Sequence, residues 1–402
     1  MANIEGYLRW RGDLSMNIDP FNEVDNLVLA QLSYVDFDGI VPEDNETWIP
    51  IREVRDRYWQ IHTEEEISKR QSFVKLSPFL LGLVAGTERF GNMKLAGYVN
   101  HVSQKEEAQM SAVQYLLDDG TIYVAFRGTD ETLVGWKEDF NLSFSTETEG
   151  QRLALDYLKR YFSNTSKRLR VGGHSKGGNF AIYASAFAGP EVLHQIETVY
   201  TNDGPGFREE VLNRPEYRLV MERTISIIPQ GSIIGMLLGT KRSHRVVGSC
   251  ARGIMQHDAM SWNVLGNRFV TAERSRDSIF MEKTLSRWLD GIDDEEREMF
   301  VDQLFAFMEA SGARTMKEMR DSSLKEIKSI LRMAKDLPWQ RQKEFMDIVL
   351  QLFKTGSETL QDTISEGIEA KRLERERLGN KQDESDEPED DDDTLTGEIL
   401  PQ

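Results

Sequence analysis

Cysteine is almost absent from this sequence of 402 residues, which contains Cys250 alone. A single cysteine cannot form an intramolecular disulfide, so the sequence does not indicate an oxidising compartment. It also excludes a structural zinc site built on several cysteines. No two histidines have the His-x-x-x-His spacing of a helical zinc site. We therefore expect no metal and no organic cofactor.

Long apolar runs are also missing. No stretch of about 18 residues is both apolar and free of charges, so we expect no transmembrane segment. Residues 1–19 have no apolar run behind a basic stretch, which argues against a secretory signal peptide. The cytoplasm is the expected location.

Basic side chains are outnumbered, with 49 Lys and Arg against 68 Asp and Glu and a formal net charge of -19. A nucleic-acid-binding protein needs a basic surface, so we expect no nucleic-acid partner. Docking on an anionic membrane by charge is disfavoured for the same reason. About half of the net negative charge lies in residues 382–402, which contain ten acidic residues and no basic one.

Four regions differ in their sequence pattern. Residues 1–90 show helical spacing and are predicted to pack on a core that spans 91–274. Residues 275–380 show amphipathic helical spacing and are predicted to form a helical appendage. Residues 381–402 are predicted to be a disordered acidic tail. Within residues 275–378, the apolar helix faces are suited to self-association or to a protein partner.

The core begins with three predicted strands, 94–102, 108–117 and 121–126, the last two joined by the turn Asp118-Asp119-Gly120. Strands then alternate with helices. The later elements are strands 168–171, 197–201, 224–228 and 245–247, with a helix at 177–188. Alternation of this kind predicts an α/β fold with a mostly parallel central sheet.

The most informative segment is Gly173-His174-Ser175-Lys176-Gly177, which fits the Gly-x-Ser-x-Gly pattern. A serine at a sharp turn between a strand and a helix is exposed above the sheet, and glycines on both sides let the backbone pass closely. The predicted strand before this segment and the small-residue helix after it supply the required context. A phosphate-binding loop fits poorly, because Lys176 is followed by glycine and not by serine or threonine.

A second segment, Phe126-Arg127-Gly128-Thr129, ends a predicted strand and is followed by Trp136 and Asp139. Together with Gly-His-Ser-x-Gly-Gly, this pattern resembles class 3 lipases, which are α/β hydrolases. The stretch 21–27 and the segment Gln256-His257-Asp258 resemble more closely the Mbeg1-like family of bacterial proteins. The resemblance covers roughly residues 18–268.

The resemblance implies roles for several residues. Ser175 matches the nucleophile, and Thr129 matches a residue whose backbone N–H forms half of the oxyanion hole. The backbone N–H of Lys176, directly after the nucleophile, is expected to form the other half. Arg127, Trp136 and Asp139 are expected to brace the loop.

A serine nucleophile needs a base, and in α/β hydrolases the base follows the serine in the chain. Of the six histidines, His257 follows the last predicted core strand and matches the Gln-His-Asp segment of the family. We therefore predict that His257 is the base. The remaining reading of this residue is a hydrogen-bonded loop histidine.

The sequence determines the acid that orients the base less clearly than it determines the serine or the histidine. Between Arg223 and Gln256 there is no Asp or Glu, and Ser232 stands where class 3 lipases carry an aspartate. The best substitute is Asp203, at the carboxyl end of the preceding predicted strand. The segment 201–207 also fits an Asx turn with a local use for this side chain. Glu222 and Asp258, or a Ser–His pair oriented by Ser232 or a backbone carbonyl, remain open.

These residues predict a serine hydrolase that cleaves an acyl ester, either a lipid or a small ester. The apolar segment 233–239 can line an acyl pocket, form a lid or belong to the core. The alternative is a weakly active or inactive hydrolase fold that acts as a binding module through its helical appendage. The missing carboxylate between Arg223 and Gln256 favours this alternative.

Overall fold

The computed structural model describes residues 2–69, 77–129, 133–240, 243–291, 293–295 and 297–298. The predicted appendage is described only where it begins, and the predicted tail, 381–402, lies outside the described residues.

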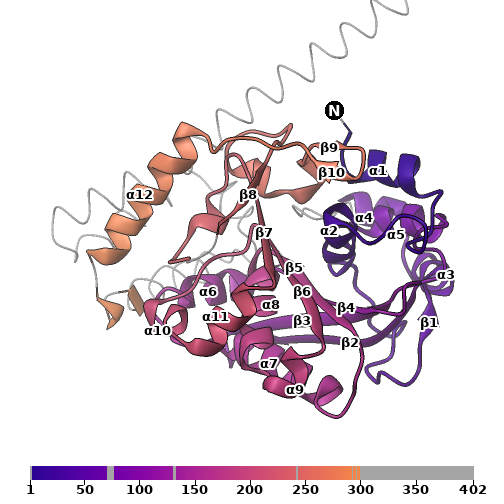
Figure 1. Cartoon of the computed structure of the whole chain (residues 1–402), viewed down its shortest axis with the longest axis horizontal. Helices are drawn as coiled ribbons and strands as arrows, with labels where there is room; N and C mark the ends of the chain where they lie inside the picture. The colour runs from indigo at the N-terminus through magenta and orange to yellow at the C-terminus, as the bar shows by residue number, and fades with distance from the viewer. Residues whose placement is uncertain are drawn as a thin grey trace, which may run out of the picture. The chain divides into compact units, whose positions relative to one another are not determined.

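Eight strands form one sheet in which the spatial order follows the chain order (Figure 1). The strands are β1 (Ile49–Pro50), β2 (Lys94–Ser103), β3 (Ala108–Leu116), β4 (Ile122–Phe126), β5 (Leu169–His174), β6 (Ile196–Asn202), β7 (Thr224–Pro229) and β8 (Arg245–Val247). The first four pair antiparallel, and β4 to β8 pair parallel. With helices between the parallel strands, this is an α/β-hydrolase fold. The predicted strands are confirmed, and within this sheet the sequence missed the short edge strand β1.

Helices precede, connect and follow the strands. They are α1 (Ile4–Arg11), α2 (Glu23–Leu32), α3 (Ile51–Ile61), α4 (Glu64–Lys69), α5 (Ser77–Ala85), α6 (Leu133–Asn141), α7 (Glu149–Phe162), α8 (Lys176–Phe187), α9 (Pro190–Leu193), α10 (Glu209–Leu212), α11 (Pro215–Met221) and α12 (Arg276–Asp290). A short two-stranded ribbon, β9 (Val264–Leu265) with β10 (Arg268–Phe269), follows the core. The helical character predicted for residues 1–90 is found in α1 to α5.

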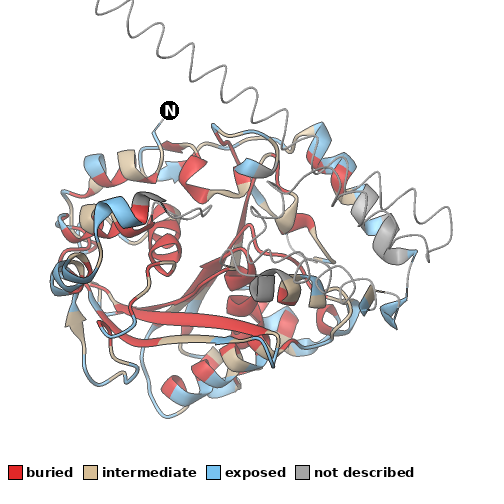
Figure 2. Cartoon of the chain, turned by 180° about the vertical axis from the view of Figure 1, so that it is seen from behind, coloured by how far each residue is buried: buried red, intermediate tan, exposed pale blue. Residues whose placement is uncertain are grey.

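The sheet is buried on both faces (Figure 2). Along β4, Tyr123 and Ala125 belong to one apolar cluster, and Val124 and Phe126 belong to the other, as the two-residue period of a strand requires. Right-handed crossovers between strands in sequential order all fall on one face. Helices α7, α8 and α11 pack on that face. The N-terminal helices α1, α2 and α5 cover the other face, so the core needs this segment.

Helix α12, at the start of the predicted appendage, contacts the loop after β7. The Ser275 N–H donates to the Gln230 carbonyl at 2.8 Å, and the Ser278 hydroxyl donates to the Ser232 carbonyl at 2.5 Å. Met281 is buried. The beginning of the appendage is therefore attached to the same loop that carries Ser232.

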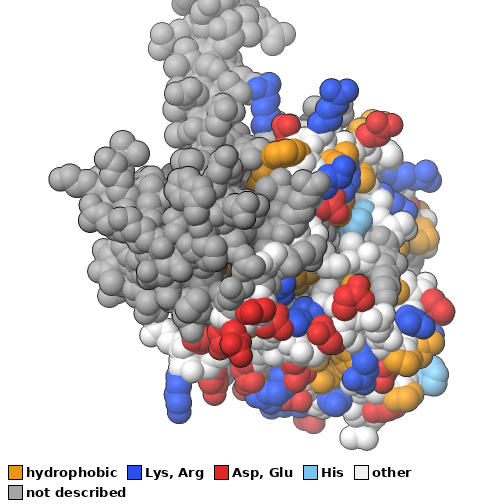
Figure 3. All heavy atoms as spheres, turned by 90° about the vertical axis from the view of Figure 1, so that its left-hand side faces the viewer, with side chains coloured by type: hydrophobic (Ala, Val, Ile, Leu, Met, Phe, Trp, Pro, Cys, Tyr) orange, Lys and Arg blue, Asp and Glu red, His pale blue; other side chains and the backbone are white. Residues whose placement is uncertain are grey.

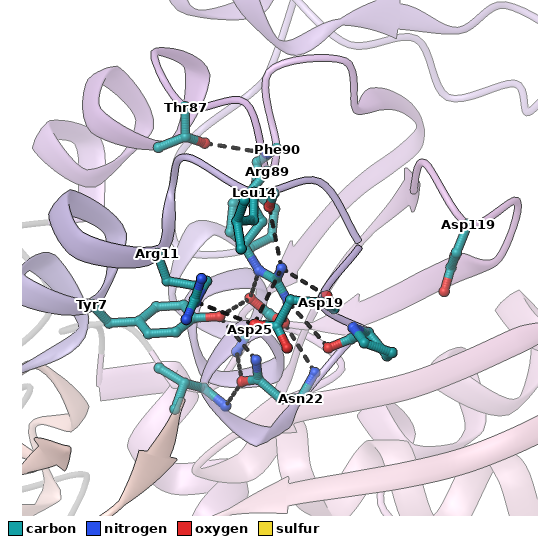
Figure 4. Close-up of polar contacts among 12 residues, drawn as sticks. Tyr7, Arg11, Leu14, Asp19, Asn22, Asp25, Thr87, Arg89, Phe90 and Asp119 are labelled. Carbon is teal, nitrogen blue, oxygen red and sulfur yellow. Dashed lines mark hydrogen bonds and ion pairs between the residues drawn. The ribbon is translucent and has the colours of Figure 1, made fainter. Parts of the chain in front are cut away.

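A buried ion pair fixes α2 against the loop after α5 (Figure 4). Arg89 contacts both carboxylate oxygens of Asp25, and neither side chain is exposed. The Tyr7 hydroxyl and the Asn22 backbone N–H donate to the same carboxylate at 2.8 and 2.9 Å. Arg89 also donates to the carbonyls of residues 14, 19 and 20. Every charge is thus hydrogen-bonded, which a buried pair requires.

Among the described helices, none combines the length and the apolar character needed to cross a membrane. On the face shown in Figure 3, the described side chains of Asp and Glu are interspersed with those of Lys and Arg. The described acidic side chains are therefore not gathered into one acidic field on this face.

Replacement of Arg89 should be strongly destabilising, because it leaves the Asp25 carboxylate buried without its cation. We expect Arg89→Met to lower the free energy of unfolding by about 3–5 kcal/mol. The same substitution at Arg168, whose side chain is 59% exposed and pairs with Glu197 at the surface, should cost less than about 1 kcal/mol. Urea unfolding of both variants measures the difference, and equal losses would contradict a special role of the buried pair.

Candidate active site

Ser175 lies at the sharp turn between β5 and α8. Its backbone has φ 58° and ψ -133°, a conformation that costs a non-glycine residue roughly 1–3 kcal/mol. The Ser175 N–H still donates to the Asn202 carbonyl at 2.9 Å, so the pairing of β5 with β6 reaches the turn. The side chain stands at the carboxyl end of the parallel strands, as the sequence pattern predicts.

Gly177 shows why the pattern needs glycine after the serine. A Cβ atom at this position would lie 2.1 Å from the Phe126 carbonyl oxygen and 2.8 Å from the Arg127 carbonyl carbon. Both atoms belong to the backbone and have no room to move. The first turn of α8 therefore packs directly on the end of β4.

His257 reaches Ser175 from a 3-10 turn, Gly253–His257, which follows β8. Its Nε2 lies 2.9 Å from Ser175 Oγ. The other ring nitrogen, Nδ1, lies 2.7 Å from Asp203 Oδ2. Three residues separated by 82 and 54 positions along the chain are thus joined by two hydrogen bonds.

Asp203 follows β6 and also has a positive φ, 51°. Its N–H donates to the Ile227 carbonyl at 2.8 Å, which continues the pairing of β6 with β7. The carboxylate is 1% exposed. Besides His257, it accepts hydrogen bonds from the Ser232 hydroxyl at 2.5 Å and from the Gly235 N–H at 3.2 Å. Donors on both oxygens hold the carboxylate in one orientation.

The protonation of His257 follows from these partners. An ionised carboxylate only accepts hydrogen bonds, so Nδ1 carries the proton that is donated to Asp203. The lone pair of Nε2 then faces Ser175 and accepts from its hydroxyl. A neutral imidazole in this tautomer can take a proton from the serine.

The other acid candidates lie elsewhere. Glu222 follows α11, just before β7 begins. It therefore lies at the amino ends of the parallel strands, whereas Ser175 lies at their carboxyl ends. The Asp258 carboxylate accepts from the Met260 N–H at 2.9 Å and caps the turn Ala259–Ser261. Burial raises the pKa of Asp258 to about 6. Ser232, in the place of the lipase aspartate, donates to Asp203 and does not contact His257 in the hydrogen bonds described.

The loop after β4 lies beside the nucleophile. A Cβ atom at Gly128 would lie 3.0 Å from the Ser175 Cβ and 2.5 Å from the His174 carbonyl oxygen, so only glycine allows this approach. The next residue, Thr129, donates its hydroxyl to the Asp139 carboxylate. Asp139 thus braces the loop. The side chain of Trp136 lies outside the described residues.

Lys176 combines two features that the sequence did not connect. Its backbone opens α8 directly after Ser175, and its side chain is completely buried. The ammonium lies 2.8 Å from the Glu138 carboxylate, which also accepts from the Gln109 and Gly150 N–H groups at 2.9 and 2.8 Å. Nothing in the sequence identifies Glu138 as the partner of Lys176, because no spacing along the chain links α6 to α8.

The site also contacts the N-terminal segment, which sequence analysis assigned only a packing role. Asn26 on α2 donates to the Asn202 side chain at 2.9 Å, next to Asp203, and accepts from the Tyr123 hydroxyl at 2.7 Å. Tyr34 contacts the ring of His174 at 2.9 Å. No signal in the sequence identifies these residues, since their partners lie 97 to 176 positions away.

The remaining histidines lie away from Ser175. His194 is exposed at the end of α9, and His244 lies 2.8 Å from the Ser226 hydroxyl. His101 pairs with Glu106 at the surface. In the part of the chain that the structure describes, no group of three or more His, Cys, Asp or Glu side chains could hold a metal ion.

The apolar segment 233–239 lies next to the acid, since the Gly235 N–H donates to Asp203. Met236 is buried. Ile233, Ile234, Leu237 and Leu238 are half-buried, so part of their apolar surface is accessible.

The chain has an α/β-hydrolase fold in which a serine, a histidine and an aspartate are joined by hydrogen bonds. The Mbeg1-like family matches residues 84–306, more than half of the chain, and the chain belongs to this family. A solved structure of a protein called M37 lipase is similar at 14% sequence identity and a TM-score of 0.31. That likeness covers 52% of this chain and 67% of the M37 lipase chain. No curated protein matches the sequence.

Stability should depend on pH through Asp139. Burial raises its pKa to about 6, and the neighbouring Glu138 charge acts in the same direction, against the Lys176 charge and the Thr129 hydrogen bond. As the pH falls from 7 to 5, the folded state takes up a proton that the unfolded state does not yet bind, so this group adds stability on acidification. In Asp139→Asn, which keeps the acceptor for Thr129, this addition is lost.

Urea unfolding at pH 5, 6 and 7 checks the sign. The free energy of unfolding of the wild type, minus that of Asp139→Asn, should increase as the pH is lowered. Asp156→Asn, at an exposed position on α7, serves as the control for the loss of a surface carboxylate. A difference that stays constant or decreases on acidification would show that the pKa of the Asp139 carboxyl is not raised.

Proposed function

We propose that this chain is a serine hydrolase of the class 3 lipase-like type that cleaves acyl esters through an acyl-enzyme. The observation that carries the proposal is the continuous hydrogen-bonded series from Ser175 Oγ through both nitrogens of His257 to Asp203. The strained backbone at Ser175 and at Asp203 supports it, since such strain concentrates at functional sites.

In the first half-reaction, Ser175 Oγ attacks the acyl carbonyl carbon while His257 Nε2 takes the hydroxyl proton. Asp203 stabilises the imidazolium through Nδ1–H and remains ionised. The carbonyl oxygen becomes an oxyanion, for which the backbone N–H groups of Thr129 and Lys176 are the proposed donors. His257 then protonates the departing alkoxide, and the acyl group stays on Ser175.

In the second half-reaction, water replaces the alcohol. His257 takes a proton from the water, the hydroxyl oxygen bonds to the acyl carbon, and the proton returns to Ser175 Oγ as the carboxylic acid leaves. The bond formed to the enzyme in the first half is broken in the second, so the enzyme is regenerated. Every step uses side chains or backbone groups of this chain and one water molecule.

An ester with an apolar acyl group is the proposed substrate, either a lipid or a small ester. Segment 233–239 supports this, because its Gly235 bonds to Asp203 and its half-buried residues offer apolar surface for an acyl chain. Action in the cytoplasm remains a prediction.

A fluorophosphonate probe tests whether Ser175 is activated, since the probe phosphonylates only an activated serine. We expect rapid labelling of the wild type and none of Ser175→Ala. Asp203→Asn should label roughly two to four orders of magnitude more slowly, because the amide favours the wrong tautomer of His257. His257→Ala should fall at least as far. Ser185→Ala, the same substitution on α8, the helix that follows Ser175, should label like the wild type.

Hydrolysis of p-nitrophenyl esters of increasing acyl length then tests the substrate class. Turnover that disappears in Ser175→Ala would support the proposal. A folded wild type that neither labels nor hydrolyses any ester, with and without detergent, would contradict it and favour a binding module instead.

A further inference from the structure

The base is held by a loop and not by a strand. His257 is the last residue of a five-residue 3-10 turn, and its position depends on contacts of the loop backbone. The Trp262 indole N–H donates to the Gln256 carbonyl at 2.8 Å, and the Gln256 side chain accepts from the Gly231 N–H at 2.9 Å. The His257 carbonyl itself lies 2.8 Å from His174 Nε2.

His174 is the residue directly before the nucleophile, and it is 2% exposed. Its two ring nitrogens have different partners, the His257 carbonyl at Nε2 and the Tyr34 hydroxyl at Nδ1, 2.9 Å away. A carbonyl only accepts hydrogen bonds, so Nε2 must carry a proton. Burial, with the nearby His257 as the second cause, lowers the pKa of His174 to about 3, so the ring is neutral. Nδ1 is therefore unprotonated and accepts from Tyr34.

These bonds form one directed series across three segments. The Tyr34 hydroxyl donates to His174 Nδ1, and His174 Nε2–H donates to the His257 carbonyl. The rings of His174 and His257 also lie against each other, with centroids 4.6 Å apart and planes inclined by 33°. Tyr34 lies close to the loop after β4 as well, since a Cβ atom at Gly128 would come within 2.1 Å of its hydroxyl.

We propose that Tyr34 and His174 are positioning residues, which hold the backbone of His257 so that Nε2 stays in line with Ser175 Oγ. The His257 carbonyl fixes the tautomer of His174, Tyr34 fixes the orientation of its ring, and His174 fixes the loop. This inference rests on the proposed function, because it concerns the geometry of the same nucleophile and base. Neither residue contacts Ser175 Oγ in the hydrogen bonds described.

Removal of either bond should lower reactivity without removing any catalytic group. In Tyr34→Phe, Nδ1 of His174 loses its hydrogen-bond donor, so the ring is held at Nε2 alone. In His174→Leu, the His257 carbonyl loses its donor altogether. A displacement of about 1 Å at a catalytic group can cost about 100-fold in rate. We therefore expect phosphonylation to slow by about 10-fold in Tyr34→Phe and by about 100-fold in His174→Leu.

Rescue separates positioning from packing. The side-chain amide of glutamine can place an N–H near the position of Nε2, so His174→Gln should recover most of the rate that His174→Leu loses. Tyr161→Phe is the matched control. The Tyr161 hydroxyl, on α7, donates to the Glu43 carbonyl at 2.6 Å, so this change likewise removes one tyrosine hydrogen bond. It should label at the wild-type rate.

Nitrogen NMR of protein with 15N-labelled histidine reads the tautomer without any hydrolysis. We expect His174 to be neutral with the proton on Nε2 at pH 6, and the Nδ1 resonance to shift in Tyr34→Phe, where the hydrogen bond to Nδ1 is lost. A protonated ring or an Nδ1–H tautomer in the folded wild type would overturn the proposal.

The two measurements fail in different ways. If the wild type labels, and both Tyr34→Phe and His174→Leu label at the wild-type rate, then the positioning role of Tyr34 and His174 is wrong. The proposed function stands in that case. If His174 shows the Nε2–H tautomer but the wild type does not label, the proposed function is wrong, and the catalytic consequence of the pair falls with it.

Discussion

The structure depends on two strained turns at neighbouring strand ends. β5 and β6 are parallel neighbours, and each ends on a non-glycine residue with a positive φ, Ser175 and Asp203. The next strand pairing continues into each turn, through the Asn202 and Ile227 carbonyls, so the sheet itself enforces the strained backbone. Ser175 and Asp203, the proposed nucleophile and acid, are thereby presented at the carboxyl ends of neighbouring strands, at a separation that one imidazole ring spans.

The N-terminal segment is part of this arrangement and more than a cover for the sheet. Sequential strand order leaves one face of the sheet without crossover helices, and α2 fills that face. Because Asp25 is locked by Arg89, α2 has a fixed position. From there Asn26 reaches the end of β6, and the chain after α2 brings Tyr34 to His174. Asp25, Asn26 and Tyr34 precede the stretch matched by the family, 84–306.

Most of the fold could be predicted from sequence, because the strands are short apolar runs with clear boundaries. The Gly-x-Ser-x-Gly segment also has a fixed local spacing. Ser175 and His257 are found for the same reason, from a pattern and from chain order. Asp203 was ambiguous, since its Asx-turn sequence explains the side chain locally. Its contact with His257 depends on where the turn Gly253–His257 lies relative to the end of β6. The helical appendage beyond residue 298 and the tail lie outside the described residues, so both stay predictions.

Residues that act through distant partners could not be predicted. Glu138 and Lys176 carry opposite charges on different helices, and Tyr34 and His174 lie 140 positions apart. Their pairing is set by how the helices pack on the sheet, which no single-sequence period reports. Ser232 is a related case: the sequence marks it as the place of a missing acid, and packing makes it a donor to the acid that is present.

A crystal structure of the phosphonylated protein tests the central claim most directly. The account predicts phosphorus bound to Ser175 Oγ, with the phosphoryl oxygen within hydrogen-bonding distance of the backbone N–H groups of Thr129 and Lys176. His257 should remain bonded to Asp203. A phosphoryl oxygen turned towards solvent, an adduct on another residue, or a His257 ring separated from Asp203 would contradict it.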